Sequence, residues 1–283
     1  MKVMGQPWQL QIAAKSLKKQ EKIRAIRDFI APLEGKTCLE IGCDKGVLSY
    51  YLRQCGGHWT SVDADEENVR ITRELVKENV AYTDGKHLDF ENQHFDWIIA
   101  IDFLEHIQTD QEFIGEMHRV LKDDGILYIT VPHTEKGLIL NAVRRWLGFK
   151  PEDYGHVREG YSLRELQEKL DKGGFHIQRS TSFSRFFSEG IELGMNFAYF
   201  FWLSRKQHRG GIKGGISPNS EDDAAHHAKS LKFYALIYPV VKTISLLDKL
   251  ILFTQGYILM VSAKKNNEHI SYRRIRICWD SFS

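Results

Sequence analysis

From Lys36 onward, short runs of β-forming residues alternate with stretches of helical periodicity. Such alternation is typical of a parallel sheet, because two parallel neighbours need a crossover connection that is usually a helix. The sequence therefore predicts an α/β fold. Strands are expected at residues 37–41, 58–62, 80–83, 95–101 and 126–131, with helices at 8–30, 47–55, 66–77 and 111–121.

The second half of the chain carries clear start and stop signals. Ser162 and Glu165 form a capping box ahead of an apolar helical pattern, and Gly173 and Gly174 end it. Two further strand-like runs at residues 175–183 and 256–263 are separated by a long interruption. We expect an N-terminal helical segment at 1–35, a sheet domain at 36–183 and 255–264, a helical insertion at 184–254 and a tail at 265–283. Within the insertion, residues 205–230 are rich in Gly, Ser, His and charge, which predicts a mobile loop.

The strongest local signal is the segment LEIGCDKG at residues 39–46. An apolar strand there delivers Glu40 into a turn that Gly42 and Gly46 bracket before a helix begins. Glycines let the backbone bend sharply and let a ligand approach closely. Asp63 ends the second strand, where an acid can accept hydrogen bonds from ribose hydroxyls. These features alone fit a dinucleotide or an adenosyl cofactor equally well.

Five longer segments occur in one order at suitable spacings: TCLEIGCDKG, SVDAD, DFENQHFDWIIAIDFLEHI, EMHRVLKDDGILYITVPH and HVREGYSLRELQEKLDKGGF. Together they resemble the class I S-adenosylmethionine-dependent methyltransferases of small molecules, the ubiquinone-biosynthesis type in the methyltransferase type 11 group. The resemblance covers residues 36–183 and resumes at 256–264. It implies a Rossmann-like, mostly parallel sheet of seven strands with helices on both faces. The last two strands, here 175–183 and 256–263, would form an antiparallel hairpin.

The resemblance also implies a site for S-adenosylmethionine. Glu40 is similar to the acid that orients the cofactor's amino group, and Asp63 to the acid that binds its ribose. Asp84 is similar to the acid that meets the adenine amino group, beside the backbone N–H of Gly85. The other residues expected around the cofactor are Gly42, Cys43, Asp44 and Gly46 in the first turn, Ala64 after the ribose acid, and Ala100, Ile101 and Asp102 beside the sulfonium.

Asp44 departs from the family pattern, which usually has a glycine at this place. Aspartate tolerates the left-handed backbone region better than most residues, so we expect the turn to survive. The acids also have structural alternatives: Glu40 and Asp63 could cap helices, and Asp84 could belong to an Asp-Gly turn. Cys43 is expected to be an inert loop residue.

Methyl transfer needs an aligned nucleophile, and a hydroxyl acceptor also needs a base to take its proton. His106 follows the fourth strand in DFLEHI, His133 follows the fifth, and His156 begins HVREGYS. In the family the position of His106 faces the acceptor, so we favour it as the base. The alternative is a histidine that holds a helix start through a backbone hydrogen bond.

The composition of the predicted insertion, residues 184–254, indicates what kind of acceptor the protein could bind. Residues 191–203 are rich in aromatic side chains, and residues 233–252 are apolar with lysines at their edges. Such segments could close over an apolar or lipid-linked acceptor, or lie flat on a membrane surface where lysines, here Lys229, Lys232, Lys242 and Lys249, meet anionic headgroups. The alternative is a helical pair packed on the edge of the sheet or at a dimer interface.

Composition narrows the classes of partner and the cellular location that we expect for this protein. The 39 basic and 37 acidic residues nearly cancel, so no nucleic-acid partner is expected. The cysteines lack CxxC spacing, and no metal-ligand cluster or N-terminal apolar run stands out, so we expect a cytoplasmic protein without a metal, at most peripheral at the inner membrane surface.

Two alternatives to an active methyltransferase remain: a catalytically silent cofactor-binding subunit, and an NAD(P)-dependent oxidoreductase, which would need a tighter GxGxxG. The acceptor atom and the oligomeric state are left open.

Overall fold

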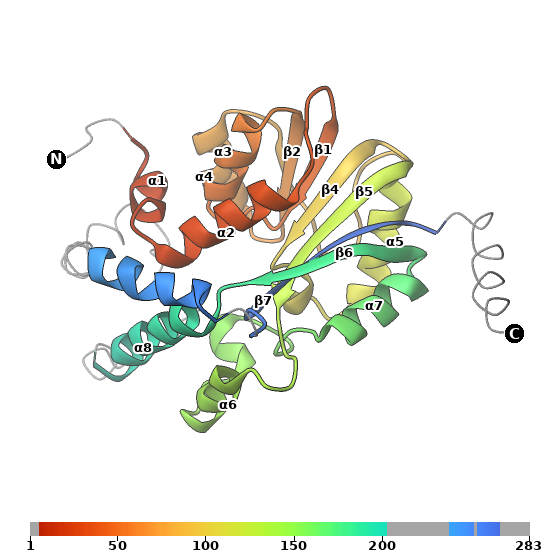
Figure 1. The fold of residues 1–283 in the computed structure, drawn as a ribbon. Coiled ribbons are helices and arrows are strands. Elements are labelled where there is room, and N and C mark those ends of the chain that lie inside the picture. The colour runs from red at the N-terminus through yellow and green to blue at the C-terminus, as the bar shows by residue number, and fades with distance from the viewer. Residues whose placement is uncertain (1–5, 203–237, 252–253, 267–283) are drawn as a thin grey trace, which may run out of the picture.

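The computed structural model describes residues 6–202, 238–251 and 254–266. Its centre is one seven-stranded sheet in the order β3-β2-β1-β4-β5-β7-β6 (Figure 1). Strands β1 to β5 pair in parallel, whereas β7 is antiparallel to both β5 and β6. The strands are β1 (Thr37–Ile41), β2 (His58–Asp63), β3 (Val80–Tyr82), β4 (Phe95–Ile101), β5 (Leu121–Pro132), β6 (Phe175–Phe183) and β7 (Ile258–Lys265). The predicted Rossmann-like sheet with its antiparallel last pair is confirmed.

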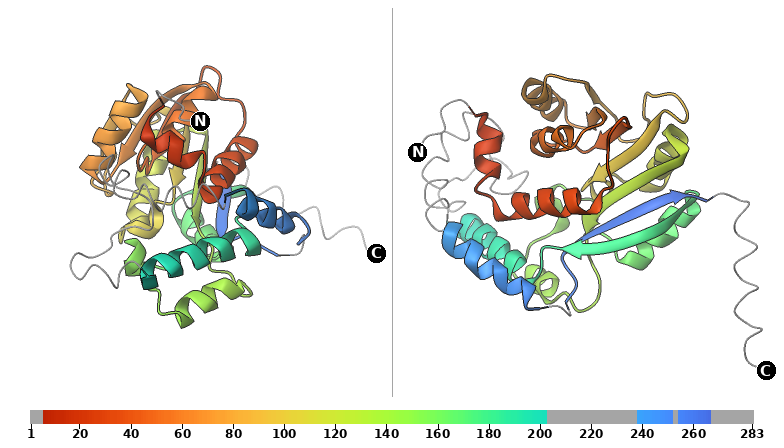
Figure 2. Two further views of the ribbon diagram at one scale, coloured as in Figure 1. Left: turned by 90° about the vertical axis from the view of Figure 1, so that its left-hand side faces the viewer. Right: turned by 45° about the horizontal axis from the view of Figure 1, so that its top comes forward.

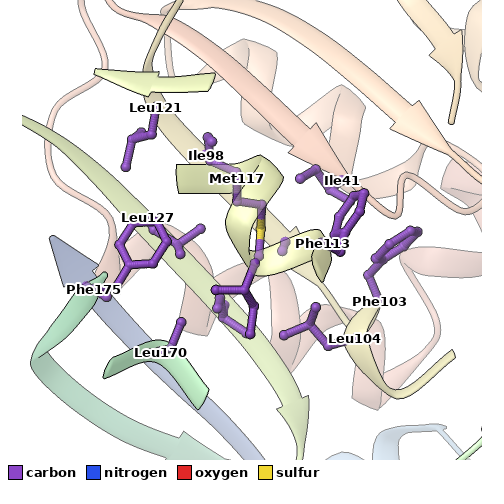
Figure 3. Close-up of a cluster of buried hydrophobic side chains, with 14 of the residues drawn as sticks. Ile41, Ile98, Phe103, Leu104, Phe113, Met117, Leu121, Leu127, Leu170 and Phe175 are labelled. Carbon is purple, nitrogen blue, oxygen red and sulfur yellow. The ribbon is translucent and has the colours of Figure 1, made fainter. Parts of the chain in front are cut away.

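Helices cover both faces of this sheet. On one face α2 (Leu17–Phe29) and α3 (Val47–Gln54) bury Phe29 and Leu52 against strand residues such as Trp97. On the other face, α5 (Asp110–Val120) and α7 (Leu163–Lys172) form the larger core. Figure 3 shows this second cluster, in which Phe113 and Met117 of α5 lie among side chains of the strands. Burial on both faces explains why the strands read as continuous apolar runs.

The strand order places the candidate site. From β1 the chain runs outward through β2 and β3, joined by α3 and α4 (Glu66–Val76), then returns to pair β4 on the other side of β1. The order therefore reverses between β1 and β4. In open parallel sheets, ligands bind outside the carboxyl ends of the strands at such a reversal. The turns after β1, β2, β4 and β5 all meet at this edge.

Three local features differ from the sequence prediction. The helix expected at 8–30 is two helices, α1 (Trp8–Ala13) and α2, because the side chain of Ser16 caps the second one by accepting from the Lys19 N–H. The strand expected at 126–131 begins earlier, at Leu121, and contains a bulge, since Phe95 pairs with Leu121 while Trp97 pairs with Ile126. Helix α6 (Ile139–Trp146) and the short helix η2 (Pro151–Tyr154) were not predicted.

Asp110, at the start of α5, holds the segment between α6 and α7 in place through its side-chain contacts. The buried carboxylate of Asp110 accepts from Tyr161 Oη at 2.7 Å and Lys169 Nζ at 2.9 Å, and it pairs with Arg158. Burial alone would raise the pKa of Asp110, but these partners lower it overall. This network holds residues 156–161 in place beside η1 (Leu104–His106).

The insertion between β6 and β7 begins with α8 (Phe186–Trp202). A second helical stretch at 238–245, followed by η4 (Leu246–Lys249), lies beside α8 in both views of Figure 2. Asp248 joins them, because its carboxylate accepts from the Phe187 and Ser188 N–H groups at 2.8 and 2.9 Å. Residues 205–230, predicted as a mobile loop, and 267–283 of the predicted tail lie outside the described residues. Within the described ranges, no helix has the length and apolar character needed to cross a membrane.

Candidate active site

The turn after β1 is too tight for side chains at its two glycines. Gly42 has φ +83°, and a Cβ there would lie 2.7 Å from the Ile101 carbonyl oxygen. Gly46 has φ +77°, and a Cβ there would lie 3.0 Å from Thr72 Cα. Asp44 between them adopts φ +47°, so the turn does form with an aspartate in place of glycine. The turn therefore lies directly against β4 and α4.

Asp63 connects this turn to the next one. Its Oδ2 accepts from the Asp44 N–H at 2.8 Å, and its Oδ1 accepts from the Asp65 N–H at 3.0 Å and from Asn68 Nδ2 at 3.2 Å. Burial raises the pKa of Asp63, partly opposed by these donors. A carboxylate has about four acceptor positions, so one of them is left for a ligand hydroxyl.

Glu40 and Cys43 lie inside the protein at the first turn. Glu40 is completely buried, and its Oε2 accepts from Ser61 Oγ at 2.6 Å. Its Oε1 has no hydrogen-bond partner among the described residues. Burial raises the pKa of Glu40 and also that of the Cys43 thiol, which therefore stays protonated. The inert role expected for Cys43 agrees with this environment.

At the end of β4, Asp102 is held by β5 and by α2. Its N–H donates to the Thr130 carbonyl at 2.9 Å, and Thr130 Oγ1 donates to its Oδ1 at 2.7 Å. Lys22 of α2 pairs with Oδ2. Burial by itself would raise the pKa of Asp102, but Lys22 lowers it overall. Ala100 and Ile101 are buried in the sheet just before it.

Helix α2 thus brings positive charge to the edge of the sheet. Lys19 lies 3.8 Å from Asp44 and Lys22 pairs with Asp102, so two acids of the expected cofactor site face lysines. The sequence predicted a helix over these residues, but it did not indicate which acids the lysines would meet. Lys19 and Lys22 therefore belong to the candidate site, although the sequence did not predict them there.

Asp84 follows β3 and forms a local turn. Its Oδ1 accepts from the Lys86 and His87 N–H groups, both at 2.8 Å, and these donors lower its pKa. The Gly85 N–H, expected to face the adenine, donates to Thr83 Oγ1 at 3.3 Å. Asp84 and Ala64 are exposed. The structural alternative for Asp84 is therefore realised, and its exposed carboxylate remains accessible to a ligand.

The three candidate histidines separate into a pair and a single residue. His106 is exposed, with Nδ1 2.9 Å from the Gly155 carbonyl, and its ring lies perpendicular to that of His156 with centroids 4.6 Å apart. Burial and the neighbouring His106 lower the pKa of the half-buried His156 to about 4. His133 is buried elsewhere, with Nδ1 2.9 Å from the Gly256 carbonyl.

Glu105, for which the sequence predicted no role, lies beside the histidine pair. It is completely buried, and neither carboxylate oxygen has a partner among the described residues. One ligand atom each of Glu105, His106 and His156 lies within 4.8 Å of the others. Two imidazoles and a carboxylate suit a divalent transition metal by type. Because His156 lies fifty residues away in the chain, no local spacing could have revealed this cluster.

A cavity of about 130 Å³ opens beside His156. It is bounded by the start of α2, the end of β5, α6, η2, α8 and the start of β7. Asp102 acts electrostatically on both His156 and Lys18, which line the cavity. The cavity therefore adjoins the end of β4, where a second substrate would meet the cofactor.

The sequence pattern of the methyltransferase domain family matches residues 16–180. A ubiquinone biosynthesis O-methyltransferase from Rickettsia bellii is 27% identical over 165 residues, which cover 56% of this chain and 68% of that protein. The protein of the same description from Caulobacter vibrioides is 30% identical over 146 residues, which cover 47% and 58% of the two chains.

Solved structures agree on the fold. An S-adenosylmethionine-dependent methyltransferase from Mesorhizobium loti superposes with a TM-score of 0.52 at 12% identity, over 86% of this chain and 96% of that one. The [4+2]-cyclase SpnF gives 0.55 at 19% identity, over 87% and 81%. Because a cyclase shares this fold, the reaction must be argued from the site.

We predict that Glu105→Gln stabilises the fold at neutral pH. Burial, assisted by Asp102, raises the pKa of Glu105 well above its ordinary value. As pH rises through the ordinary pKa of glutamate, the unfolded chain loses this proton while the folded chain keeps it, so wild-type stability falls. The advantage of the variant should grow with pH by at most about 1.4 kcal/mol per pH unit. Urea unfolding at pH 5, 6.5 and 8 measures it.

Glu165→Gln is the matched control. Bonds from Ser162 lower the pKa of Glu165, so the stability that its charge contributes is constant above the ordinary glutamate value and is lost only as pH falls below it. Glutamine still completes the capping box. The control should therefore differ from wild type by a constant amount between pH 5 and 8. A constant difference for Glu105→Gln over the same range would contradict the prediction.

Proposed function

This chain belongs to the class I S-adenosylmethionine-dependent methyltransferases, and from that premise we propose that it methylates a hydroxyl group of a small acceptor bound in the cavity beside His156. The observation that carries the proposal is the convergence of the glycine turn, Asp63, Asp102 and this cavity at one edge of the sheet. The relatives from Rickettsia bellii and Caulobacter vibrioides are ubiquinone biosynthesis O-methyltransferases, which supports an oxygen acceptor.

The residues at the edge fit an adenosyl cofactor. Gly42 and Gly46 let the turn pack tightly against β4 and α4, where a Cβ would clash. Glycines in such a turn also let a ligand approach its backbone closely. We assign the ribose hydroxyls to Asp63 and the adenine amino group to the exposed carboxylate of Asp84. The unpartnered Oε1 of Glu40 supports a role, direct or through water, in orienting the cofactor's amino group.

The cofactor supplies a methyl group on a cationic sulfonium, which is already electrophilic. The protein's contribution is to align the acceptor, exclude water and take up a proton. Asp102 provides negative charge at the end of β4, and Lys22 partly neutralises it. Among the histidines, His156 lines the cavity, so we assign it the acceptor's proton. His106 packs against it and positions it through Gly155.

We predict that Asp63→Asn weakens S-adenosylmethionine binding about 10- to 100-fold, because one strong acceptor for the ribose hydroxyls is lost. Asp65→Asn is the matched control: it lies two residues away, caps α4, and asparagine caps helices equally well. Isothermal titration calorimetry with S-adenosylmethionine measures both. Equal affinities for wild type and a folded Asp63→Asn would overturn the assignment of the ribose.

We predict that His156→Gln lowers turnover to S-adenosylhomocysteine about 10²- to 10⁴-fold across a panel of hydroxyl acceptors while leaving cofactor affinity unchanged. With a pKa of about 4, His156 is unprotonated at neutral pH. Wild-type kcat/KM should therefore stay level down to about pH 5 and fall towards pH 4. A weak base favours acidic hydroxyls, so phenols should be better acceptors than alkyl alcohols.

Two further variants test whether His156 is the base. In His106→Gln the acid limb should move to higher pH, because a neighbouring imidazole no longer lowers the pKa of His156. His118→Gln is the control, since His118 is also partly buried but packs against Phe175, away from the cavity. An acid limb near pH 6.5 in wild type, or full activity in His156→Gln, would rule His156 out.

We further propose that the acceptor is apolar or lipid-linked and that residues 191–252 touch a membrane surface. Support comes from exposed apolar side chains in the described part of this stretch: Val240, Ile244, Leu246, Leu247 and Leu250. Lys242 and Lys249 lie among them, whereas Lys229 and Lys232 are outside the described residues. Apolar side chains interspersed with lysines are typical of helices that lie on anionic membranes.

We predict that Leu247→Ser combined with Leu250→Ser reduces co-sedimentation with vesicles of phosphatidylcholine and phosphatidylglycerol several-fold. The control is Tyr82→Ser, which removes an exposed side chain on β3. Unchanged co-sedimentation of the double variant would refute the membrane contact. A change from dimer to monomer in sedimentation velocity, with vesicle binding unaltered, would identify these residues as a dimer interface instead.

A further inference from the structure

The cavity beside His156 carries an excess of positive charge. Four basic side chains line it, Lys18, Arg144, Arg145 and Lys150, but only two acidic ones, Glu159 and Glu189. Like charges gathered in a partly enclosed space repel each other and lose hydration. Within this lining, the basic side chains therefore outnumber the acidic ones by two.

The ion pairs show where this excess lies. Glu189, only 2% exposed, is shared by two cations, pairing with Arg144 and lying 4.0 Å from Lys18. Arg145 pairs with Glu159 at 3.1 Å. Lys150 has no ion-pair partner within the described ranges. Counted within the lining, one surplus charge thus belongs to the Lys18–Glu189–Arg144 group and the other to Lys150.

A neutral donor is also unused in this cavity. The Tyr154 hydroxyl is buried and has no hydrogen-bond partner among the described residues. Burial raises the pKa of Tyr154, so the hydroxyl keeps its proton. A buried polar group without a partner is costly, and such groups in cavities often indicate a ligand. The cation that most influences Tyr154 is Arg144.

From the surplus cations and this hydroxyl, we propose that the cavity binds an oxyanion, a carboxylate or phosphate, carried by the acceptor. This inference rests on the proposed function, because it names the class of acceptor for the same cavity. Lys150 and the Lys18–Glu189–Arg144 group supply the surplus charge, and Arg145, whose bond to Glu159 uses only part of its guanidinium, supplies further N–H donors. The Tyr154 hydroxyl donates a hydrogen bond, and both kinds of oxyanion are suitable partners. The anion thereby orients the acceptor, so that its hydroxyl reaches His156.

The test measures binding of small probes to the full chain saturated with S-adenosylhomocysteine. Phenyl phosphate and benzoate are the anionic probes, and benzyl alcohol is the neutral one. We expect at least one anion to bind about tenfold or more tightly than benzyl alcohol in isothermal titration calorimetry. Whichever anion binds more tightly identifies phosphate or carboxylate as the group recognised.

The variant Arg145→Gln/Lys150→Gln should weaken binding of that anion about tenfold or more. Arg70→Gln is the matched control, because Arg70 is 55% exposed and Arg145 57% exposed, and both pair with glutamates. Tyr154→Phe removes only the hydroxyl and should weaken binding several-fold. Thermal unfolding of each variant verifies that it is folded.

Three results would overturn the inference: no measurable binding of either anion, equal binding of benzyl alcohol, or wild-type affinity in the double variant. Failure of the proposed function has a different signature. In that case anions would still bind and depend on Arg145 and Lys150, but no hydroxyl acceptor would be turned over. Loss of anion binding with turnover of neutral phenols intact would reject the inference alone.

Discussion

The parallel pairing of β1 with β4 is the constraint on which the rest of the structure depends. The strand order reverses there, and ligands of open parallel sheets bind outside the carboxyl ends of the strands at such a reversal. The turn after β1 must then fold back against the Ile101 carbonyl, which leaves no room for a Cβ at Gly42. Asp63 links this turn to the next through its bond to the Asp44 N–H. The proposed cofactor residues are held by the backbone of the sheet itself.

The balance of acidic and basic side chains changes along this edge of the sheet. At the cofactor end, lysines of α2 face Asp44 and Asp102, so carboxylates and ammonium groups nearly balance. Towards α6 and η2 the basic side chains outnumber the acidic ones. Glu105, His106 and His156 form a cluster in which burial disfavours charge on two members: burial raises the pKa of Glu105 and lowers that of His156. A neutral base next to a basic cavity suits an acceptor that brings its own negative charge.

The fold followed from local patterns because each strand and most helices carry their own signals. Residues 175–183 were predicted as a strand with the bounds it has, and Ser162 with Glu165 caps α7 as expected. Helix α6 was not predicted although Leu140 and Val143 lie on one face and pack with Leu193 of α8. It has eight residues, which is too short for a clear helical period in the sequence. The break in the N-terminal helix depends on one capping bond at Ser16, which competes closely with helix continuation.

The sequence by itself determined the fold, the family and the cofactor, since those rest on glycines, acids and apolar periods that lie close together along the chain. It also placed Asp44 in a left-handed turn, because backbone preference is local. Only the tertiary structure decided which side chains meet. Lys22 reaches Asp102 across eighty residues, and His156 joins Glu105 and His106 across fifty. Such contacts depend on how the helices pack over the sheet, and the spacing of residues in the sequence does not predict that packing. The charge of the cavity, assembled from α2, α6, η2 and α8, was likewise decided in three dimensions.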